Sequence, residues 1–428
     1  MWRYIYSTLL YILLPFVLIR LLWRSRNAPG YRHRWAERFG FSKIPTQYQQ
    51  GIWIHVVSVG EAIAAAPLIQ SLSEQYSLPL IITTTTPTGS ERVQALLPQN
   101  AYHVYCPYDL PGSVKRFLDK ARPQMAIFME TEIWPNIIEY CYQRNVPTII
   151  ANARLSERSK VGYQRVAKII QPTLSKITLL AVQYHQDAQR FKELGVKPEQ
   201  IKITGNMKFD MPISASLLES AESLRQQWGA NRPIFVAAST HEGEEEIILQ
   251  AFQTILQNHP STLLVLVPRH PERFDRVYQL CEQSGYKTAR RSKPLEDQQE
   301  DYSIFLGDTM GEVRLFCAAS DIAFVGGSLI QRGGHNLLEP AAFKLPVITG
   351  PHTFNFAEPT TLLTQAQALS VVNNSQQLAS IVDQLINDSQ YRTQLGERSL
   401  KVVEHNRGAL QTHLDIIQTL LWGEHSAT

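Results

Sequence analysis

Cysteine is scarce in this chain of 428 residues, and several common site signatures are missing. The four cysteines lie far apart without a C-x-x-C pair, which excludes a zinc ribbon or a disulfide framework and favours a reducing compartment. No two glycines are separated by one residue and no Gly-Lys occurs, so the dinucleotide fingerprint and the Walker A loop are absent. His241-Glu242 begins like H-E-x-x-H, but position 245 is Glu. The absence of D-x-D disfavours a metal-held sugar diphosphate.

Charged residues make up only 18% of the chain, and they are unevenly distributed. Residues 1–43 contain eight Lys or Arg against one acid, Glu37, whereas the rest of the chain has 33 basic and 37 acidic residues. The formal net charge of +3 therefore combines a basic N-terminal segment with an acidic remainder, which leaves no basic domain for nucleic acid. The 44% of hydrophobic residues suffices for two or three cored domains.

An uncharged apolar run, residues 4–19, precedes most of this basic cluster. The run is marginal in length for a spanning helix and contains Pro15, so a short membrane anchor and an interfacial helix both remain open. The charge follows the run and no A-x-A-like site closes it, which disfavours a cleaved signal peptide. A buried first helix is disfavoured because the run has no polar stripe at helical spacing. Basic residues after the run place the bulk of the protein on the cytoplasmic side and attract anionic lipid head groups.

From residue 51 onward, short apolar runs alternate with helical stretches such as 62–76 and 113–120. This pattern is typical of parallel sheets covered on both faces. It is interrupted at residues 209–217 and then restarts, which predicts two doubly wound Rossmann-like domains joined near residue 212, with a ligand site between them. The predicted strands are 52–59, 80–85, 125–129, 148–151, 178–182, 234–238, 263–267, 304–306, 322–325 and 347–349.

These patterns divide the chain into four parts. We expect a membrane anchor and basic collar in residues 1–43, an N-terminal domain in 44–212, a C-terminal domain in 213–409 and a last helix in 410–428. The last helix could pack on either domain.

Acidic residues follow two predicted strands of the first half. Glu61 begins a helix, where the helix dipole favours a carboxylate whatever its task, but the end of a sheet strand also suits proton removal. Glu130 and Glu132 stand two residues apart, which is costly without a cation or a shared proton. Lys208, at the domain junction, could neutralise a carboxylate or a phosphate, although a surface lysine is usually only solvated.

The second half carries polar clusters at the same kind of position. Pro268 and Pro271 flank the turn at Arg269 and limit where its guanidinium points, as bidentate anion binding requires. The segment 307–312 opens a helix whose N–H groups suit phosphate. Glycines at 326–327 and 333–334 let a ligand approach the backbone, and Glu339 could accept from a ribose diol. Each cluster alone is weak evidence, but their concentration at strand ends of both halves is stronger.

Ten sequence strings contain or adjoin these clusters. They are SVGE (58–61), TPTGSERV (86–93), METEIWPN (129–136), ANARLS (151–156), STHEGEE (239–245), PRHPERF (268–274), GDTMGE (307–312), FVGGSL (324–329), GGHNLLEP (333–340) and GPHTFNF (350–356). Together these strings closely resemble the 3-deoxy-D-manno-octulosonic acid (Kdo) transferase family, from the N-terminal anchor to about residue 410. The resemblance implies a membrane-associated GT-B glycosyltransferase with an interdomain cleft. Such an enzyme transfers Kdo from CMP-Kdo to a lipid A precursor glycolipid in lipopolysaccharide core synthesis, with inversion and without metal or cofactor, at the cytoplasmic face of the inner membrane.

The resemblance also implies residue roles. Glu61 becomes the general base, and Glu130 and Lys208 stabilise the transition state. The CMP contacts fall on Pro268, Arg269, Met310, Gly311, Glu312, Asn336, Leu337, Leu338 and Glu339.

Two alternatives stay open. One is a GT-B transferase that uses a UDP-sugar and another membrane lipid, which the SVGE, METE and PRHPERF strings oppose. The other is a noncatalytic membrane-bound nucleotide-binding scaffold, which the intact Glu61, Glu130 and Lys208 oppose.

Overall fold

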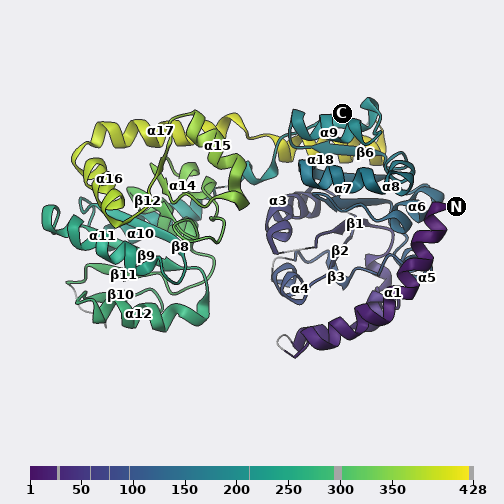
Figure 1. Cartoon of the computed structure of the whole chain (residues 1–428), viewed down its shortest axis with the longest axis horizontal. Coiled ribbons are helices and arrows are strands. Elements are labelled where there is room, and N and C mark those ends of the chain that lie inside the picture. Colours follow the sequence, from purple (N-terminus) through teal and green to yellow (C-terminus); the bar gives the residue numbers. More distant parts are fainter. Residues whose placement is uncertain are drawn as a thin grey trace. The chain divides into compact units, whose positions relative to one another are not determined.

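The protein is described by a computed structural model that covers residues 1–26, 29–57, 59–76, 78–95, 97–211, 213–293 and 301–423. It divides into two compact units. Unit 1 comprises Met1–Asp210 and the segment from Arg407 onward, and unit 2 comprises Met211–Asn406. Each unit is built on a seven-stranded parallel sheet flanked by helices (Figure 1). The predicted pair of doubly wound α/β folds is therefore confirmed.

The sheet of unit 1 has the strand order β3-β2-β1-β4-β5-β6-β7. Its order reverses between β1 and β4, so the carboxyl ends of these two neighbours open toward helices on opposite faces. The four central strands are almost fully buried, which explains their continuous apolar runs. The strands are β1 (Ile52–His55), β2 (Leu80–Thr84), β3 (Ala101–Tyr105), β4 (Met125–Met129), β5 (Thr148–Ala153), β6 (Leu179–Val182) and β7 (Ile201–Ile203).

The sheet of unit 2 has the order β10-β11-β9-β8-β12-β13-β14 and reverses between β8 and β12. Its strands are β8 (Ile234–Thr240), β9 (Leu263–Pro268), β10 (Thr288–Arg290), β11 (Ile304–Leu306), β12 (Ile322–Val325), β13 (Val347–Thr349) and β14 (Leu369–Val371).

The helical stretches predicted at 62–76 and 113–120 form α3 (Val59–Gln75) and α5 (Pro111–Ala121), which differ from the prediction only at their ends. Unit 1 contains α1 (Trp2–Arg24), α2 (Trp35–Arg38), α3 (Val59–Gln75), α4 (Pro87–Gln94), α5 (Pro111–Ala121), α6 (Pro135–Gln143), α7 (Glu157–Arg165), α8 (Ala167–Leu174), α9 (His185–Glu193), the 3₁₀ turn η4 (Met207–Phe209) and α18 (Ala409–Trp422). Unit 2 contains α10 (Ala215–Trp228), α11 (Glu245–Asn258), α12 (Phe274–Gln283), α13 (Val313–Ala318), α14 (Leu338–Ala342), α15 (Ala357–Gln365), α16 (Ser375–Asn387) and α17 (Ser389–His405).

The structure adds strands at both edges of both sheets. β3, β7, β10 and β14 coincide with none of the predicted strands, and they are the outermost strands of their sheets. An edge strand pairs on one side only. In addition, β7, β10 and β14 have three residues each and are partly exposed. Such segments lack the long apolar run from which the central strands are recognised. The predicted strand 52–59 is also too long, because β1 ends at His55 and α3 begins at Val59.

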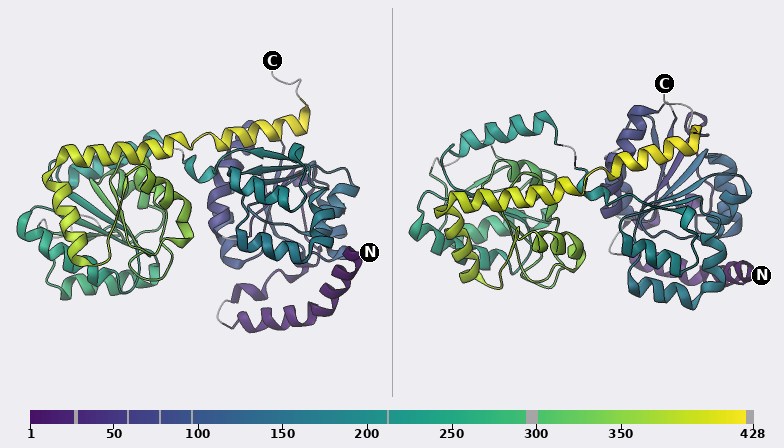
Figure 2. Two further views of the ribbon diagram at one scale, coloured as in Figure 1. Left: turned by 45° about the horizontal axis from the view of Figure 1, so that its top comes forward. Right: turned by 90° about the horizontal axis from the view of Figure 1, so that it is seen from above.

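The last helix, α18, belongs to unit 1. It packs on α3 and on the turn η4, and Ala409, Leu414, Ile416 and Ile417 are buried in the core beneath β1, β4 and β5 (Figure 2). The sequence alone leaves its partner open, because both units offer apolar surfaces.

The apolar N-terminal run forms one helix, α1, which contacts α6 and α8 on the outside of unit 1 (Figure 1). Trp2–Trp23 is long and apolar enough to cross a membrane. Its first turns, however, are tied to unit 1: Tyr6 donates to Asp109 at 2.9 Å and Ser7 donates to Asn136 at 3.1 Å. Most of its large apolar side chains, such as Ile12 and Phe16, are exposed.

Candidate active site

Two predicted site residues meet at the point where the strand order of unit 1 reverses. Glu61 lies in the first turn of α3, directly after β1, and its carboxylate accepts the backbone N–H of Val57 at 2.8 Å. Glu130 follows β4, the strand that pairs with β1. Because parallel strands end at the same edge of a sheet, β1 and β4 bring these carboxyl groups to one place.

Glu130 is a buried carboxylate held by two cations. It adopts a left-handed backbone conformation (φ 58°), which ends β4 and turns the chain away from the sheet. Its carboxylate lies 2.7 Å from Nη2 of Arg154 and 3.3 Å from Nζ of Lys208. These cations offset the cost of burying a charge. Lys208 thus meets Glu130, as its predicted neutralising role requires, whereas Arg154 was not among the predicted site residues.

Glu132 completes a cluster of three carboxyl groups. Its Oε2 accepts from Nε1 of Trp134 at 2.8 Å. Its pKa is raised to about 7, mainly by burial and also by the negative charges of Glu61 and Glu130. The repulsion expected between two neighbouring carboxylates is therefore reduced in two ways. Cations bind Glu130, and Glu132 carries a proton for part of the time at neutral pH. The spacing of Glu130 and Glu132 in the sequence indicated this pair of acids, although Glu132 was not among the predicted site residues.

In unit 2 the predicted Arg269 lies just beyond β9. Pro268 is the buried last residue of that strand, and the N–H of Arg269 donates to the carbonyl of Thr240 at 3.0 Å, next to the end of β8. The positive charge of Arg269 acts on His241, His335 and Glu339. This arginine therefore faces a cluster drawn from the ends of β8, β9 and β12.

A pair of histidines forms the centre of that cluster. Nε2 of His241 lies 2.7 Å from Nε2 of His335, and the two rings are nearly coplanar, with an interplanar angle of 2°. Burial, together with the positive charge of nearby cations, lowers the pKa of His241 to about 4 and that of His335 to about 3. Both rings are therefore neutral at pH 7, with one Nε2 donating to the other. Nothing in the sequence strings predicted this contact.

The glycine loop after β12 is occupied by a side chain of the protein. The buried carboxylate of Glu244 accepts the backbone N–H groups of Gly327, Ser328 and Leu329 at 2.6, 2.9 and 2.9 Å. A Cβ on Gly326 would lie 2.7 Å from the carbonyl oxygen of Ser239, so this glycine is needed for packing against β8. These three N–H groups are therefore already bonded within the protein, and the close approach of a ligand to the glycines at 326–327 and 333–334 stays a prediction.

The segment Met310–Glu312 lies at the start of α13. Met310 is 57% exposed, and Gly311 has a φ of 87° with open space around its Cβ position. The carboxylate of Glu312 is bound by Arg291 through Nη2 at 2.8 Å and Nε at 3.0 Å, which lowers its pKa against the effect of burial. Glu312 is thus oriented by an arginine that sequence reasoning missed.

The segment Asn336–Glu339 shapes the start of α14. Oδ1 of Asn336 accepts the N–H of Leu338 at 3.1 Å. The side chains of Leu337 and Leu338 are buried, so a ligand could meet these two residues only through their backbone. Burial raises the pKa of Glu339, while the charge of Arg314 opposes the rise.

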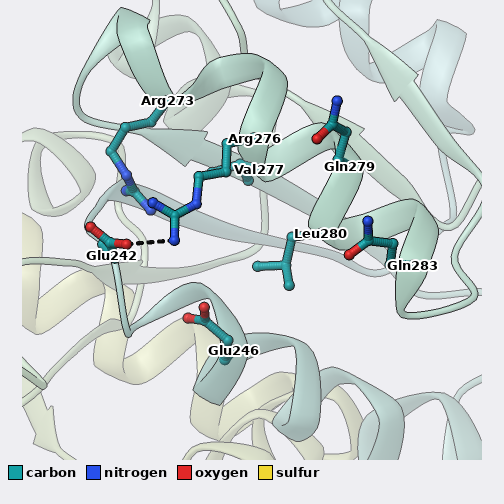
Figure 3. Close-up of a pocket in the computed structure, with 8 residues that line it drawn as sticks. All are labelled: Glu242, Glu246, Arg273, Arg276, Val277, Gln279, Leu280 and Gln283. Atoms are coloured by element: carbon teal, nitrogen blue, oxygen red, sulfur yellow. Dashed lines mark ion pairs between the residues drawn. The ribbon is translucent and has the colours of Figure 1, made fainter.

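A separate hollow of about 300 Å³ lies between α11 and α12 (Figure 3). Glu242 and Glu246 face Arg273 and Arg276 across it, and Arg276 pairs with Glu242 at 2.6 Å. It contains none of the predicted site residues. Within the described ranges, no group of three or more His, Cys, Asp or Glu side chains is arranged to hold a metal ion.

Both units match known protein families. Residues 33–211 match the family model described as 3-deoxy-D-manno-octulosonic-acid transferase (kdotransferase), and residues 220–402 match glycosyl transferases group 1. The chain is 46% identical to the 3-deoxy-D-manno-octulosonic acid transferase of Haemophilus influenzae, over 98% of this chain and 99% of that protein. The Bordetella pertussis transferase of the same name is 32% identical over 98% and 100%.

Among solved structures, UDP-GlcNAc 2-epimerase from Neisseria meningitidis has a TM-score of 0.57 at 14% identity, covering 86% of this chain and 100% of that one. This likeness shows the two-sheet fold.

Proposed function

Because this chain belongs to the Kdo transferase family of glycosyltransferases, we propose that it transfers Kdo from CMP-Kdo to a lipid A precursor in lipopolysaccharide core synthesis. The observation that carries the mechanism is the convergence of Glu61, Glu130 and Lys208 at the end of β1 and β4. A base and a cation-held carboxylate at one sheet edge suit the attack of a hydroxyl on an activated sugar.

Glu61 acts as the general base. It removes the proton from an acceptor hydroxyl as that oxygen attacks the anomeric carbon of Kdo, opposite the CMP phosphate, so that the configuration inverts. The bond from the anomeric carbon to the phosphate oxygen breaks, and its electron pair leaves with CMP. Glu130 stabilises positive charge that develops at the sugar, and Lys208, 3.3 Å away, fixes the position of that carboxylate.

The donor nucleotide binds to unit 2. Arg269 binds the CMP phosphate, and Pro268 shapes the turn that presents it. Glu339 accepts from the ribose, while Asn336 and the backbone of Leu337 and Leu338 complete that side of the site. Met310, Gly311 and Glu312 contact the remaining face of the nucleotide, with Arg291 holding Glu312. This donor has a single phosphate, whose charge one arginine and backbone N–H groups can carry.

The membrane supplies the acceptor. We place α1 in the cytoplasmic surface of the inner membrane as an interfacial helix, because its first turns are bonded to unit 1 while its outer face is apolar. Arg20 and Arg26, near the end of the helix, bind anionic head groups. The anionic glycolipid acceptor would then lie in the same leaflet as the helix.

The test is transfer by purified protein with CMP-Kdo and tetraacyl lipid A precursor, read by mass spectrometry of the product. Glu61→Gln should lose about 10²–10⁴-fold in rate, the usual contribution of a general base. Glu74→Gln, an exposed change on the same helix, is the matched control and should keep the full rate. Equal rates for the two variants would remove Glu61 as the base. Transfer from UDP-sugars but not from CMP-Kdo would overturn the donor assignment.

A further inference from the structure

Strand β5 contains an irregularity next to the candidate active site. It pairs with β6 through Ile149 and Ile150, and the pairing resumes only at Ala153. Within the irregular stretch, Asn152 adopts a left-handed conformation with a φ of 54°. Asn is one of the few residues besides glycine that accepts this conformation readily. The backbone N–H of Asn152 is thereby turned out of the sheet ladder and needs another partner.

That partner is His413 of the C-terminal helix α18, 261 positions away in the chain. The N–H of Asn152 donates to Nε2 of His413 at 2.9 Å, and Nδ1 of the same ring lies 2.6 Å from the carbonyl of Ala409. A carbonyl can only accept, so Nδ1 carries the proton and Nε2 accepts. The ring is 1% exposed, and one neutral tautomer satisfies both contacts.

The side chain of Asn152 continues this path toward Lys208. Its Oδ1 accepts the N–H of Met207 at 3.1 Å, in the turn η4. The next N–H, that of Lys208, is accepted by Asn206 at 3.0 Å, and Nζ of Lys208 lies 3.3 Å from Glu130. Nδ2 of Asn152 is buried and has no hydrogen-bond partner among the described residues. The amide side chain of Asn152 therefore acts through its oxygen, which accepts the hydrogen bond from η4.

A second set of hydrogen bonds connects α18 to the C-terminal end of η4. The carboxylate of Asp210, directly after η4, accepts the N–H groups of Gly408 and Leu410 at 2.7 Å each, at the start of α18. The turn that carries Lys208 is thus fixed to α18 on both sides, through Asn152 and His413 on one side and through Asp210 on the other. A shift of α18 must move the turn or break one of these bonds.

From these contacts we propose that His413 is a positioning residue for Lys208. The C-terminal helix α18 then helps to set the geometry of the candidate active site of unit 1. The bond from His413 holds the bulge at Asn152, and the bulge aims the oxygen that holds Met207. Without it, Lys208 would meet Glu130 in a wider range of geometries, and the placement of charged groups governs the rate of the chemical step. The proposal rests on the function proposed above, since Lys208 acts there.

The test compares His413→Leu with Leu414→Ala in the full-length protein. Leucine fills much of the space of the ring but leaves the N–H of Asn152 without an acceptor. Leu414 is the next residue of α18, equally buried in the apolar core, and it makes no polar contact, so its truncation measures loss of packing alone. We expect kcat of Kdo transfer to fall tenfold or more in His413→Leu, with KM for CMP-Kdo changed less than twofold, while Leu414→Ala keeps kcat within about threefold. His413→Gln, which offers an acceptor oxygen, should recover part of the loss.

Hydrogen exchange gives a readout that does not depend on catalysis. The amides of Asn152 and Met207 should exchange faster in His413→Leu than in Leu414→Ala. If His413→Leu does not fold, Asn152→Gly replaces it, because glycine keeps the left-handed turn and removes only the oxygen that holds Met207; it should show the same loss of kcat and the same faster exchange at Met207. Where both single variants fold, combining them should cost little more than either alone.

The outcomes separate this proposal from the proposed function. If Lys208→Ala transfers Kdo at the normal rate, the role of Lys208 is wrong, whatever His413 does. If Lys208→Ala is inactive while His413→Leu matches Leu414→Ala in both kcat and exchange, the positioning role of His413 is overturned.

Discussion

At the scale of single residues, the candidate active site of unit 1 is governed by how three acids share one place. Glu130 pairs with Arg154 and Lys208, whereas Glu132, whose pKa is raised by burial, accepts a hydrogen bond from Trp134. Glu61, the third acid, accepts the backbone N–H of Val57 at 2.8 Å. This division of roles follows from burial and neighbours, because the three side chains are chemically alike.

Glu132 should make stability depend on pH. Its pKa is raised from 4.5 to about 7 in the folded protein, mainly by burial, so the folded state holds this proton more tightly than the unfolded state does. The free energy of unfolding should therefore fall as the pH rises from about 4.5 through about 7. Glu132→Gln cannot ionise and should melt at a higher temperature than wild type at pH 8, but not at pH 5.

The control for this comparison is Glu199→Gln, an exposed glutamate of unit 1, whose difference from wild type should be the same at both values of pH. A Glu132→Gln variant whose difference in melting temperature from wild type is unchanged between pH 5 and pH 8 would contradict the raised pKa of Glu132.

We also expect the rate of transfer to rise between pH 6 and 8 in wild type, because an ionised Glu132 makes Glu61 a stronger base.

At the scale of elements, the loop after β12 shows how a buried carboxylate can organise a backbone. Glu244 accepts four N–H groups, three from the glycine loop and one from His241. It therefore joins the end of β8 to the end of β12, the two strands between which the sheet order reverses. The loop is preorganised by the protein itself, and the hydrogen-bonded His241 and His335 lie directly beside it.

Removing the charge of Glu244 should weaken both the loop and nucleotide binding. Glu244→Gln points an NH₂ group at backbone donors and leaves at least one of them unsatisfied, at a cost of about 1–3 kcal/mol. We expect a melting temperature lower by roughly 2–10 °C and weaker CMP binding by calorimetry. Glu242→Gln is the matched control, because Glu242 is two residues away and more than half exposed in its pair with Arg276, and it should leave both quantities unchanged. Equal behaviour of the two variants would show that the loop does not need this carboxylate.

At the scale of the whole molecule, the proposed membrane association of α1 has two possible forms, a helix that spans the bilayer and a helix that lies in its surface. A helix that crossed the hydrocarbon layer would carry its first residues about 30 Å away from the cytoplasmic surface. In the structure these residues are bonded to unit 1 instead: Arg3 lies 3.7 Å from Glu139, and Lys168 stacks on the ring of Trp2. The exposed apolar face of α1 is then available to lie in the membrane surface.

Cysteine labelling distinguishes the two arrangements. All four natural cysteines are buried, so a single new cysteine at position 2 can be followed with a membrane-impermeant maleimide. Trp2→Cys should react in inverted inner-membrane vesicles and stay unlabelled in right-side-out spheroplasts. Gln411→Cys, exposed on α18, is the control for the cytoplasmic side. Labelling of position 2 from outside the spheroplasts would show that the helix spans.

The sequence by itself determined the parts that local patterns report. Runs of buried apolar residues identified the central strands, such as β1 and β4, because a strand covered on both faces has no polar positions. The acids that follow these runs, Glu61 and Glu130, were singled out because they come after an apolar run, although β1 ends at His55, earlier than predicted. The edge strands β7, β10 and β14 were not, since short and half-exposed segments resemble loops.

Only the tertiary structure decided which groups face one another. Arg154 reaches Glu130, Glu244 takes the N–H groups of the glycine loop, and His413 completes the bulge at Asn152. Each contact joins segments separated by 24 to 261 positions. No local pattern encodes such a partner, because the sheet order and the packing of α18 bring these segments together, and burial then makes each partner necessary.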